Sequence, residues 1–178
     1  HAAAKDAAVS EVDPKLLEKL GLFEVRSRAT DKRVFLQRPD AGRALSDEAR
    51  AELGRRCARA PPLQIVCGDG LSAVPLNEHL EPFHRALEQE LAAGGVRAGT
   101  PFFVRYSRVK IMDKIARLLD AEACLFACGE GATAANREVI SNINPRGIEP
   151  ARAARLTAEA LARILRERKS GVAVQSGA

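Results

Sequence analysis

Two arginines in one short run are the first candidates for chemistry. Arg105 and Arg108 lie in the segment 99–111, together with three aromatic residues. A guanidinium group can grip a phosphate or a carboxylate with two parallel hydrogen bonds, and aromatic rings offer apolar surface beside it. The run therefore predicts contact with a large, mostly apolar ligand that carries a negative group. A solvated basic face is the plainer interpretation, and both alternatives stay open.

Two further candidate loops combine glycine with an acidic residue. Gly68-Asp69-Gly70 follows the apolar run 63–67, and Glu130 follows the apolar run 123–128. Glycine lets a backbone approach a ligand closely. A carboxylate after a buried strand must face solvent, a partner or a ligand, because burying it alone is costly. We expect Glu130 to contact a ligand, whereas the first loop is equally well interpreted as a tight turn, since it lacks the third glycine of a dinucleotide fingerprint.

The sequence offers no set of side chains for independent catalysis. No Ser-His-Asp set, metal-ligand cluster or phosphate loop is apparent, so we predict neither catalytic residues nor a metal site. The four cysteines lack CxxC spacing and are interpreted as buried thiols of the reduced cytosol. His79 and His84 have no obvious carboxylate partner, and we expect both at the surface. These observations predict a binding module.

Alternating strands and helices in the second half of the chain must position these loops. The predicted strands are 63–67, 102–104, 123–128 and 138–140. Two helices are predicted at 109–119 and from Pro150 onward. A further predicted helix contains Phe83 and ends at Gly94-Gly95, with Pro82 in its first turn or at a kink. Such alternation indicates an α/β fold with a mostly parallel sheet and helices on both faces. Ligands bind beyond the carboxyl ends of such strands, so we expect the loops to converge on one crevice.

The first half of the chain is less regular. Pro14 is predicted to begin a short helix, 34–36 to form a short strand, and Ser46 to cap a helix with an acidic first turn. We therefore predict a small N-terminal extension over residues 1–45 and a Rossmann-like domain over residues 46–178.

Composition narrows the class of protein. The 178 residues carry a net charge of +5, spread along the chain, whereas nucleic-acid binders concentrate basic residues in a stripe. No apolar stretch approaches the roughly 20 residues that span a bilayer, and no signal peptide is visible. We therefore expect a cytoplasmic protein that binds neither nucleic acid nor membrane.

Several ordered runs resemble one family, the light (small) subunit of ethanolamine ammonia-lyase. The resemblance extends from Lys15 to Gly171. The matching runs are 21–27, 38–40, 69–72, 99–111, 129–130 and 140–143. Several long runs in the same order are far more specific than one short motif.

The resemblance implies a function that the residues alone do not reveal. In this family a Rossmann-like small subunit helps to hold adenosylcobalamin at its interface with a large barrel subunit. The large (heavy) subunit binds ethanolamine, and the hetero-oligomer converts it to acetaldehyde and ammonia by a radical mechanism that depends on both subunits. The resemblance implies a cytoplasmic complex and leaves open whether a bacterial microcompartment encloses it.

The resemblance also implies three cobalamin contacts. Val109 matches the family valine that offers apolar surface to the ring edge, and Glu130 matches a glutamate that accepts hydrogen bonds from corrin amides or ribose. Val139 stands where the family can have cysteine, which implies a backbone or apolar contact. Two departures are that family members have a longer segment between Glu130 and Ile140, and a longer region before the part that matches His1.

Two other functions stay open on the sequence. One is a free-standing nucleotide-binding enzyme on a Rossmann-like sheet, which the alternation of strands and Gly68-Asp69-Gly70 favour. The other is a purely structural subunit that never contacts the cofactor. Binding of a dinucleotide would favour the first, and indifference of cobalamin affinity to changes at Val109 and Glu130 would favour the second.

Overall fold

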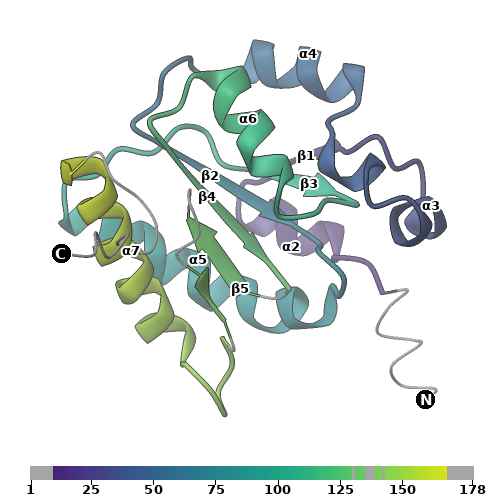
Figure 1. Ribbon diagram of the computed structural model, residues 1–178. Coiled ribbons are helices and arrows are strands. Elements are labelled where there is room, and N and C mark those ends of the chain that lie inside the picture. Colours follow the sequence, from purple (N-terminus) through teal and green to yellow (C-terminus); the bar gives the residue numbers. More distant parts are fainter. Residues whose placement is uncertain (1–9, 130, 135–138, 142, 168–178) are drawn as a thin grey trace, which may run out of the picture.

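The computed structural model of the chain describes residues 10–129, 131–134, 139–141 and 143–167, and in them one sheet has the strand order β1-β3-β2-β4-β5-β6. The strands are β1 (Phe23–Arg26), β2 (Leu63–Gly68), β3 (Phe102–Arg105), β4 (Ala123–Cys128), β5 (Gly131–Ala134) and β6 (Val139–Ile140). The helices are α2 (Pro14–Lys19), α3 (Lys32–Gln37), α4 (Asp47–Arg56), α5 (Val74–Ala93), α6 (Ile111–Leu119) and α7 (Pro150–Glu167), with a short 3-10 helix η1 at Ala41–Arg43. Helices lie on both faces of the sheet (Figure 1).

The central part of the sheet is parallel. β1, β3, β2 and β4 run in one direction, whereas β5 is antiparallel to β4, and β6 is antiparallel to β5. The predicted α/β class, the mostly parallel sheet and the helices on both faces are confirmed, and the narrower Rossmann-like description stays a prediction. Every residue of β2 and β4 is buried, which explains why both strands appear in the sequence as continuous apolar runs.

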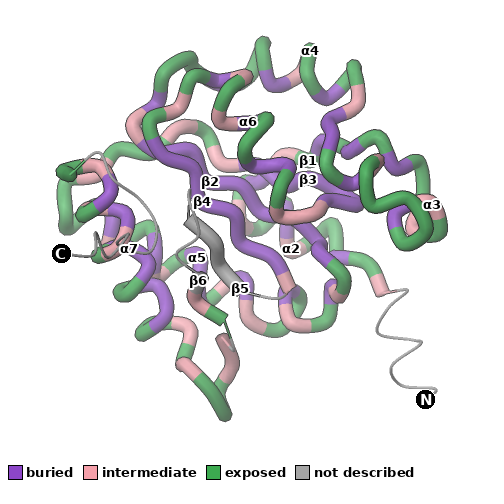
Figure 2. Tube along the Cα trace, viewed as in Figure 1, coloured by how far each residue is buried: buried purple, intermediate pink, exposed green. Residues whose placement is uncertain are grey.

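Each face of the sheet packs against its own layer of helices. One apolar cluster joins Ile65, Leu125 and other alternate strand residues to α2, α5 and α7. The other cluster joins Val66, Phe126 and their neighbours to α4 and α6. Successive side chains of a strand point to opposite faces, so each central strand contributes to both clusters. The buried strands therefore lie between two helical layers (Figure 2).

Local signals in the sequence set several helix ends as predicted. The Ser46 side chain accepts a hydrogen bond from the backbone nitrogen of Ala49 at 3.1 Å, which caps α4. α5 ends before Gly95, whose φ of +66° suits glycine. The helices predicted to begin at Pro14 and Pro150 are confirmed.

The predicted strand at 34–36 is wrong, because this segment forms α3. The Asp31 carboxylate accepts a hydrogen bond from the backbone nitrogen of Val34 at 2.8 Å and so caps the helix. This cap outweighs the preference of Val34 and Phe35 for extended backbone. Phe35 is the buried residue of α3, and its ring centroid lies 6.4 Å from that of Tyr106.

Strand β1 is an element that the sequence patterns do not reveal. It has four residues, of which only Val25 is buried, so its alternation is too short to stand out. β1 comes from the predicted extension 1–45 and pairs with β3 of the predicted domain 46–178. The division of the chain into these two parts stays a prediction.

The structure excludes one of the two alternatives for Pro82 in α5, its place in the first turn, and corrects the prediction for His84; a kink at Pro82 stays a prediction. Pro82 lies at an exposed position inside the helix, beyond its first turn, where water can reach the carbonyl group that a missing N–H leaves unbonded. His84, expected at the surface, is buried, and its Nδ1 lies 3.6 Å from the carboxylate of Glu88 one turn later. Burial lowers the pKa of His84, and the charge of Glu88 opposes that shift only in part. His79 is partly buried.

The cysteines are buried and free, as predicted. Burial raises the pKa of the Cys67 and Cys124 thiols to about 12, so neither is a reactive thiolate at neutral pH. The described residues contain no group of three or more His, Cys, Asp or Glu side chains placed to hold a metal ion. Among the described helices, none has the length and apolar character of a membrane-crossing segment.

Candidate functional site

The parallel strands bring three loops together at their carboxyl ends. We call the residues 68–72, 106–109 and Gly129 the strand-end rim. The carboxylate of Asp69 joins the first two loops, because it accepts hydrogen bonds from two backbone nitrogens of the second loop. At Gly129 an added Cβ would lie 1.9 Å from the carbonyl oxygen of Ser72, so the third loop packs directly on the first. The first two loops and Gly129 of the third converge as predicted, and the crevice between them stays a prediction.

Asp69 fixes the geometry of the rim. It is fully buried and accepts from the nitrogens of Tyr106 at 2.8 Å and Ser107 at 2.9 Å. Burial raises its pKa, while these two hydrogen bonds and the charges of Lys32 and Arg105 act in the opposite direction. Its oxygens are thus engaged with the neighbouring loop, which supports the interpretation of this segment as a structural turn.

Gly68 shows the same close packing. A Cβ at this position would lie 2.1 Å from the hydroxyl of Ser107 and 2.5 Å from the ring of Phe126. The glycine is therefore required by contacts within the chain, and a nucleotide phosphate is not needed to explain it. This observation weighs against the nucleotide-binding alternative.

Arg105 is committed to the interior of the protein. It is 4% exposed, and its guanidinium group donates to both carboxylate oxygens of Glu24, at 2.8 and 2.6 Å, with the Glu11 carboxylate 3.5 Å away. Burial lowers its pKa, but the bonds and charge of Glu24, with the charges of Glu11 and Asp69, outweigh burial and raise it. The predicted role of Arg105 as a ligand clamp is corrected to an internal ion pair.

The N-terminal segment completes this polar network. The hydroxyl of Tyr106 bonds to the carboxylate of Glu11, and Glu11 also lies beside Arg105. Burial, followed by the bond to Glu11, raises the pKa of Tyr106 to about 12. Tyr106 has a φ of +56°, a strained conformation for a side-chain-bearing residue, and the Asp69 bond to its nitrogen holds it there.

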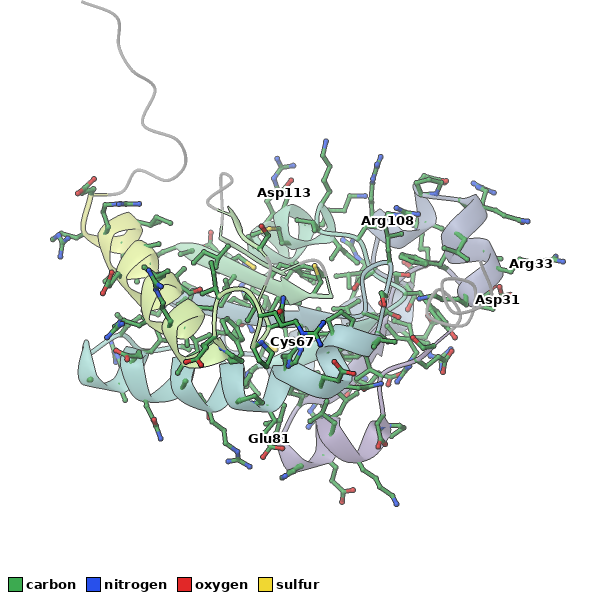
Figure 3. The ribbon with its side chains drawn as sticks, turned by 90° about the horizontal axis from the view of Figure 1, so that it is seen from below. Asp31, Arg33, Cys67, Glu81, Arg108 and Asp113 are labelled. Carbon is green, nitrogen blue, oxygen red and sulfur yellow. The ribbon has the colours of Figure 1, made fainter. Side chains whose placement is uncertain are left out.

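Arg108, in contrast, keeps a donor without a partner. Its guanidinium lies 4.7 Å from the ring centroid of Phe35 and donates to the Phe35 carbonyl at 3.2 Å, on the side of the rim next to α3 (Figure 3). The Nζ of Lys32 lies 5.1 Å from the same ring. Both Arg108 Nε and Lys32 Nζ are buried without a hydrogen-bond partner among the described residues. Two cations with spare donors are suited to ligand oxygens that bear negative charge.

The three residues predicted to contact cobalamin differ in where they lie and in how far the structure describes them. Val109 lies on the rim, partly exposed, and packs against the apolar cluster beneath α6. Glu130 lies outside the described residues. Val139 belongs to β6, and the register sets it level with Thr133 and Phe126, which lies inside β4 and not at its rim end.

Lys32 is the residue that the sequence arguments overlooked. It lies on α3, a segment that the sequence pattern predicts to be extended. That prediction does not place Lys32 beside the rim. Asp31 at the cap position before a run of side chains with one buried aromatic is the signal that identifies this helix.

Comparison with known proteins agrees with the resemblance. The family model described as "Ethanolamine ammonia-lyase light chain" matches residues 1–131 and 125–175. The chain is 34% identical to the ethanolamine ammonia-lyase small subunit of Clostridium acetobutylicum over 192 aligned residues. That alignment covers 97% of this chain and 79% of the relative.

Proposed function

The chain belongs to the ethanolamine ammonia-lyase light-chain family, and on that premise we propose that it helps to bind adenosylcobalamin against a large catalytic subunit. The family match over nearly the whole chain is the observation that carries this proposal. The assembled complex converts ethanolamine, bound in the large subunit, to acetaldehyde and ammonia. Its place is the cytoplasm, with enclosure in a bacterial microcompartment as an alternative.

The chemistry of the rim fits such a cofactor. A corrinoid presents an apolar ring edge surrounded by amide and phosphate oxygens, and Val109 offers a partly exposed apolar surface for the ring. The unpartnered donors of Arg108 and Lys32 suit the oxygens. Glu130 accepts hydrogen bonds from amide or ribose groups, and Val139 makes a backbone or apolar contact.

The chain's own part in the reaction is to bind and orient. When bound, adenosylcobalamin supplies the radical by breaking its cobalt–carbon bond. Asp69 holds the loops of the rim in place before the ligand arrives, so that little ordering of the backbone opposes binding. Val109 covers apolar surface and excludes water from it.

Reconstitution tests the proposal directly. The purified chain is mixed with the large subunit, adenosylcobalamin and ethanolamine, and acetaldehyde is measured alongside cofactor binding by absorbance. We expect both signals to require this chain. Equal activity and equal cofactor affinity without it would refute the proposal.

Two variants separate cofactor binding from a purely structural role. Glu130→Ala removes a proposed acceptor, and Val109→Trp places bulk at the ring edge; each is expected to weaken cobalamin binding by about tenfold, the effect of losing one good contact. Glu159→Ala on the exposed side of α7 is the control and should bind normally. Normal affinity in both rim variants would favour the structural role.

A further inference from the structure

Strand β1 is an edge of the sheet, and one side of its backbone has no strand beside it. Ser27 N donates to the carbonyl of Arg105 at 3.1 Å, which sets the register in which odd-numbered residues bond to β3. Glu24 and Arg26 therefore direct their N–H and C=O groups away from the sheet. The carbonyl of Arg26 accepts from Ser46 N at 3.2 Å. The backbone N–H and C=O of Glu24 and the backbone N–H of Arg26 have no backbone partner within the described ranges.

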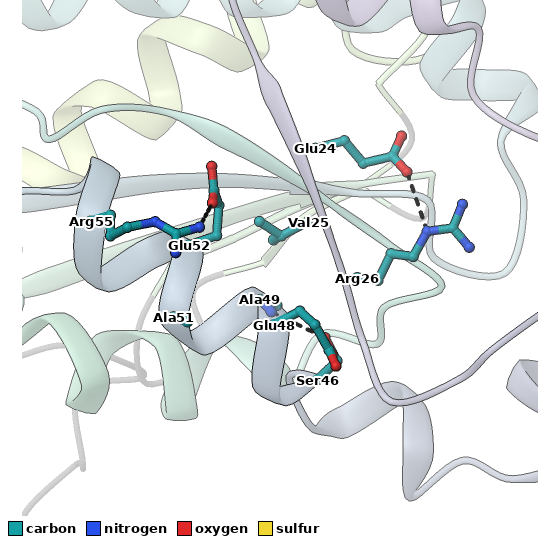
Figure 4. Close-up of a pocket in the computed structure, with 9 residues that line it drawn as sticks. All are labelled: Glu24, Val25, Arg26, Ser46, Glu48, Ala49, Ala51, Glu52 and Arg55. Carbon is teal, nitrogen blue, oxygen red and sulfur yellow. Dashed lines mark hydrogen bonds and ion pairs between the residues drawn. The ribbon is translucent and has the colours of Figure 1, made fainter.

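A groove runs along this edge. It has a volume of about 730 Å³, within the range of about 300–1,000 Å³ that ligand sites occupy, and lies between β1 and the segment from Ser46 to Arg55 (Figure 4). Exposed edges are normally covered by a loop or helix because they attract further strands. Here a bridge between Ser27 and Leu45 covers only the end of the edge. The remainder of the edge faces the groove.

The charges of the groove leave one carboxylate without a cation. Arg26 lies 3.7 Å from the Glu24 carboxylate, and Arg55 forms an ion pair with Glu52. Glu48 forms no ion pair in the part of the chain that the structure describes. Hydrogen bonds from its own backbone N–H and from Ser46 lower the pKa of Glu48, so it stays charged at neutral pH. Beside Glu48, the groove therefore favours an occupant with a positive side chain.

The backbone pattern selects the kind of occupant. A donor, an acceptor and a second donor follow one another along an extended line at the spacing of β1, and only another extended peptide complements that series. One residue of the groove also adjoins the strand-end rim, because the guanidinium of Arg26 lies 5.8 Å from the ring centroid of Tyr106. An occupant of the groove would adjoin whatever covers the rim.

We infer that the β1 groove receives an extended segment of the large subunit as an added strand, with a lysine or arginine of that segment beside Glu48. This inference rests on the proposed function for the identity of the partner. It adds a second contact, apart from the cofactor pocket, through which the two subunits hold each other.

Hydrogen exchange of single backbone amides tests the added strand. The N–H groups of Glu24 and Arg26 should exchange at least tenfold more slowly in the complex of full-length subunits than in the free chain. The N–H of Val25 already faces β3 and is the internal control, expected to change little. Unchanged exchange of Glu24 and Arg26 in a formed complex overturns the inference. So does protection that appears in the free chain as its concentration rises, because a second copy would then be the occupant.

Affinity for the large subunit tests the same contact without exchange data. Arg26→Pro removes the outward N–H but leaves the bonds to β3 intact, and Arg26→Ala removes the side chain alone. We expect the proline variant to bind about tenfold more weakly than the alanine variant. Glu48→Lys should also weaken binding, and Glu159→Lys on α7 should not.

The outcomes separate this inference from the proposed function. Wild-type affinity in both Arg26→Pro and Glu48→Lys overturns the added strand and leaves cofactor binding untouched. A normal complex that fails to bind cobalamin overturns the cofactor proposal alone. Failure of the wild-type chains to assemble overturns both.

Discussion

The buried network of Asp69 and Arg105 and the β1 groove differ in how their polar groups are bonded. Asp69 of the strand-end rim and the adjacent Arg105 are buried, and each is bonded to groups from distant parts of the chain. In the groove, the backbone of Glu24 and the charge of Glu48 find no equivalent partner in the described residues. The two regions adjoin each other, because the guanidinium of Arg26 lies 5.8 Å from the ring centroid of Tyr106.

Some polar groups stabilise the fold by bonding within the chain, whereas others are free to bond a second protein. A buried charge is tolerated only when its hydrogen bonds are satisfied, so the rim network must form as the protein folds. The exposed backbone groups of an edge strand form hydrogen bonds with water until a partner binds, so leaving them unpaired in the free chain costs little free energy. Changes to Asp69 or Arg105 should therefore reduce stability, whereas changes in the groove should reduce association.

The strongest test of the contrast is Asp69→Ala. It leaves two buried N–H groups without an acceptor, and we expect the free energy of unfolding to fall by about 3–4 kcal/mol. Urea unfolding followed by circular dichroism measures this change. Glu48→Gln in the groove is the control, with an effect far smaller than that of Asp69→Ala. Equal losses in the two variants would erase the distinction between the regions.

Removing the cation of the same network should have the next largest effect. Arg105→Met is expected to reduce the free energy of unfolding by about 2 kcal/mol, a moderate value because Glu24 retains some contact with water. In Arg105→Met/Glu24→Leu the two charges leave together, so the loss should be smaller than the sum of the single losses. Additive losses, measured in the same urea experiment, would show that the ion pair contributes nothing.

Two glycines provide a matched pair with opposite signs. Gly68→Ala forces a methyl group against Ser107 and Phe126, and should reduce the free energy of unfolding by about 1–3 kcal/mol. Gly54 lies in α4 with nothing within 4 Å of its absent Cβ, so Gly54→Ala should raise the same quantity by about 0.5–1 kcal/mol. Thermal unfolding of both variants measures the signs, and stabilisation by Gly68→Ala would contradict the packing described at the rim.

The smallest expected effect concerns His84, a buried group whose hydrogen bonds are satisfied less completely than those of Asp69. Burial lowers its pKa in the folded state below its usual value, so the unfolded chain binds its proton first as pH falls. The free energy of unfolding should therefore decrease as pH falls through about 6.5, the unfolded pKa. His84→Leu should flatten this dependence, and an identical pH profile in the variant would assign the dependence to other groups.

The sequence predicts the centre of the fold well and its first half poorly. β2, β3 and β4 are buried on both faces, so their continuous apolar runs mark them clearly. β1 is short and buried on one side only, and α3 depends on a single capping carboxylate. β1 is decided by its pairing with the distant strand β3, and α3 by one local cap; periodicity along the chain registers neither of these contacts.

The sequence predicts the location of the candidate site better than it predicts which side chains belong to it. Strand alternation alone located the rim, because parallel strands end on one side of a sheet. It did not separate Arg105, which pairs with Glu24, from Arg108, which keeps a spare donor. That distinction depends on β1 lying next to β3, a pairing that brings together Glu24 and Arg105, 81 positions apart in the sequence. Glu130 and Val139 rest on the resemblance and stay predictions.

The bond between Glu11 and Tyr106 has a consequence for how the chain tolerates shortening. Glu11 also approaches Arg105, so one residue near the start of the described chain serves two groups at the far end of β3. A proteolytic cut or a gene boundary placed just after Glu11 would remove none of the helices and strands in the part of the chain that the structure describes. It would nevertheless leave the Tyr106 hydroxyl and the Arg105 guanidinium without the Glu11 carboxylate, beside the proposed cobalamin surface. A fragment with all of its described helices and strands intact would therefore still differ from the full chain at this surface.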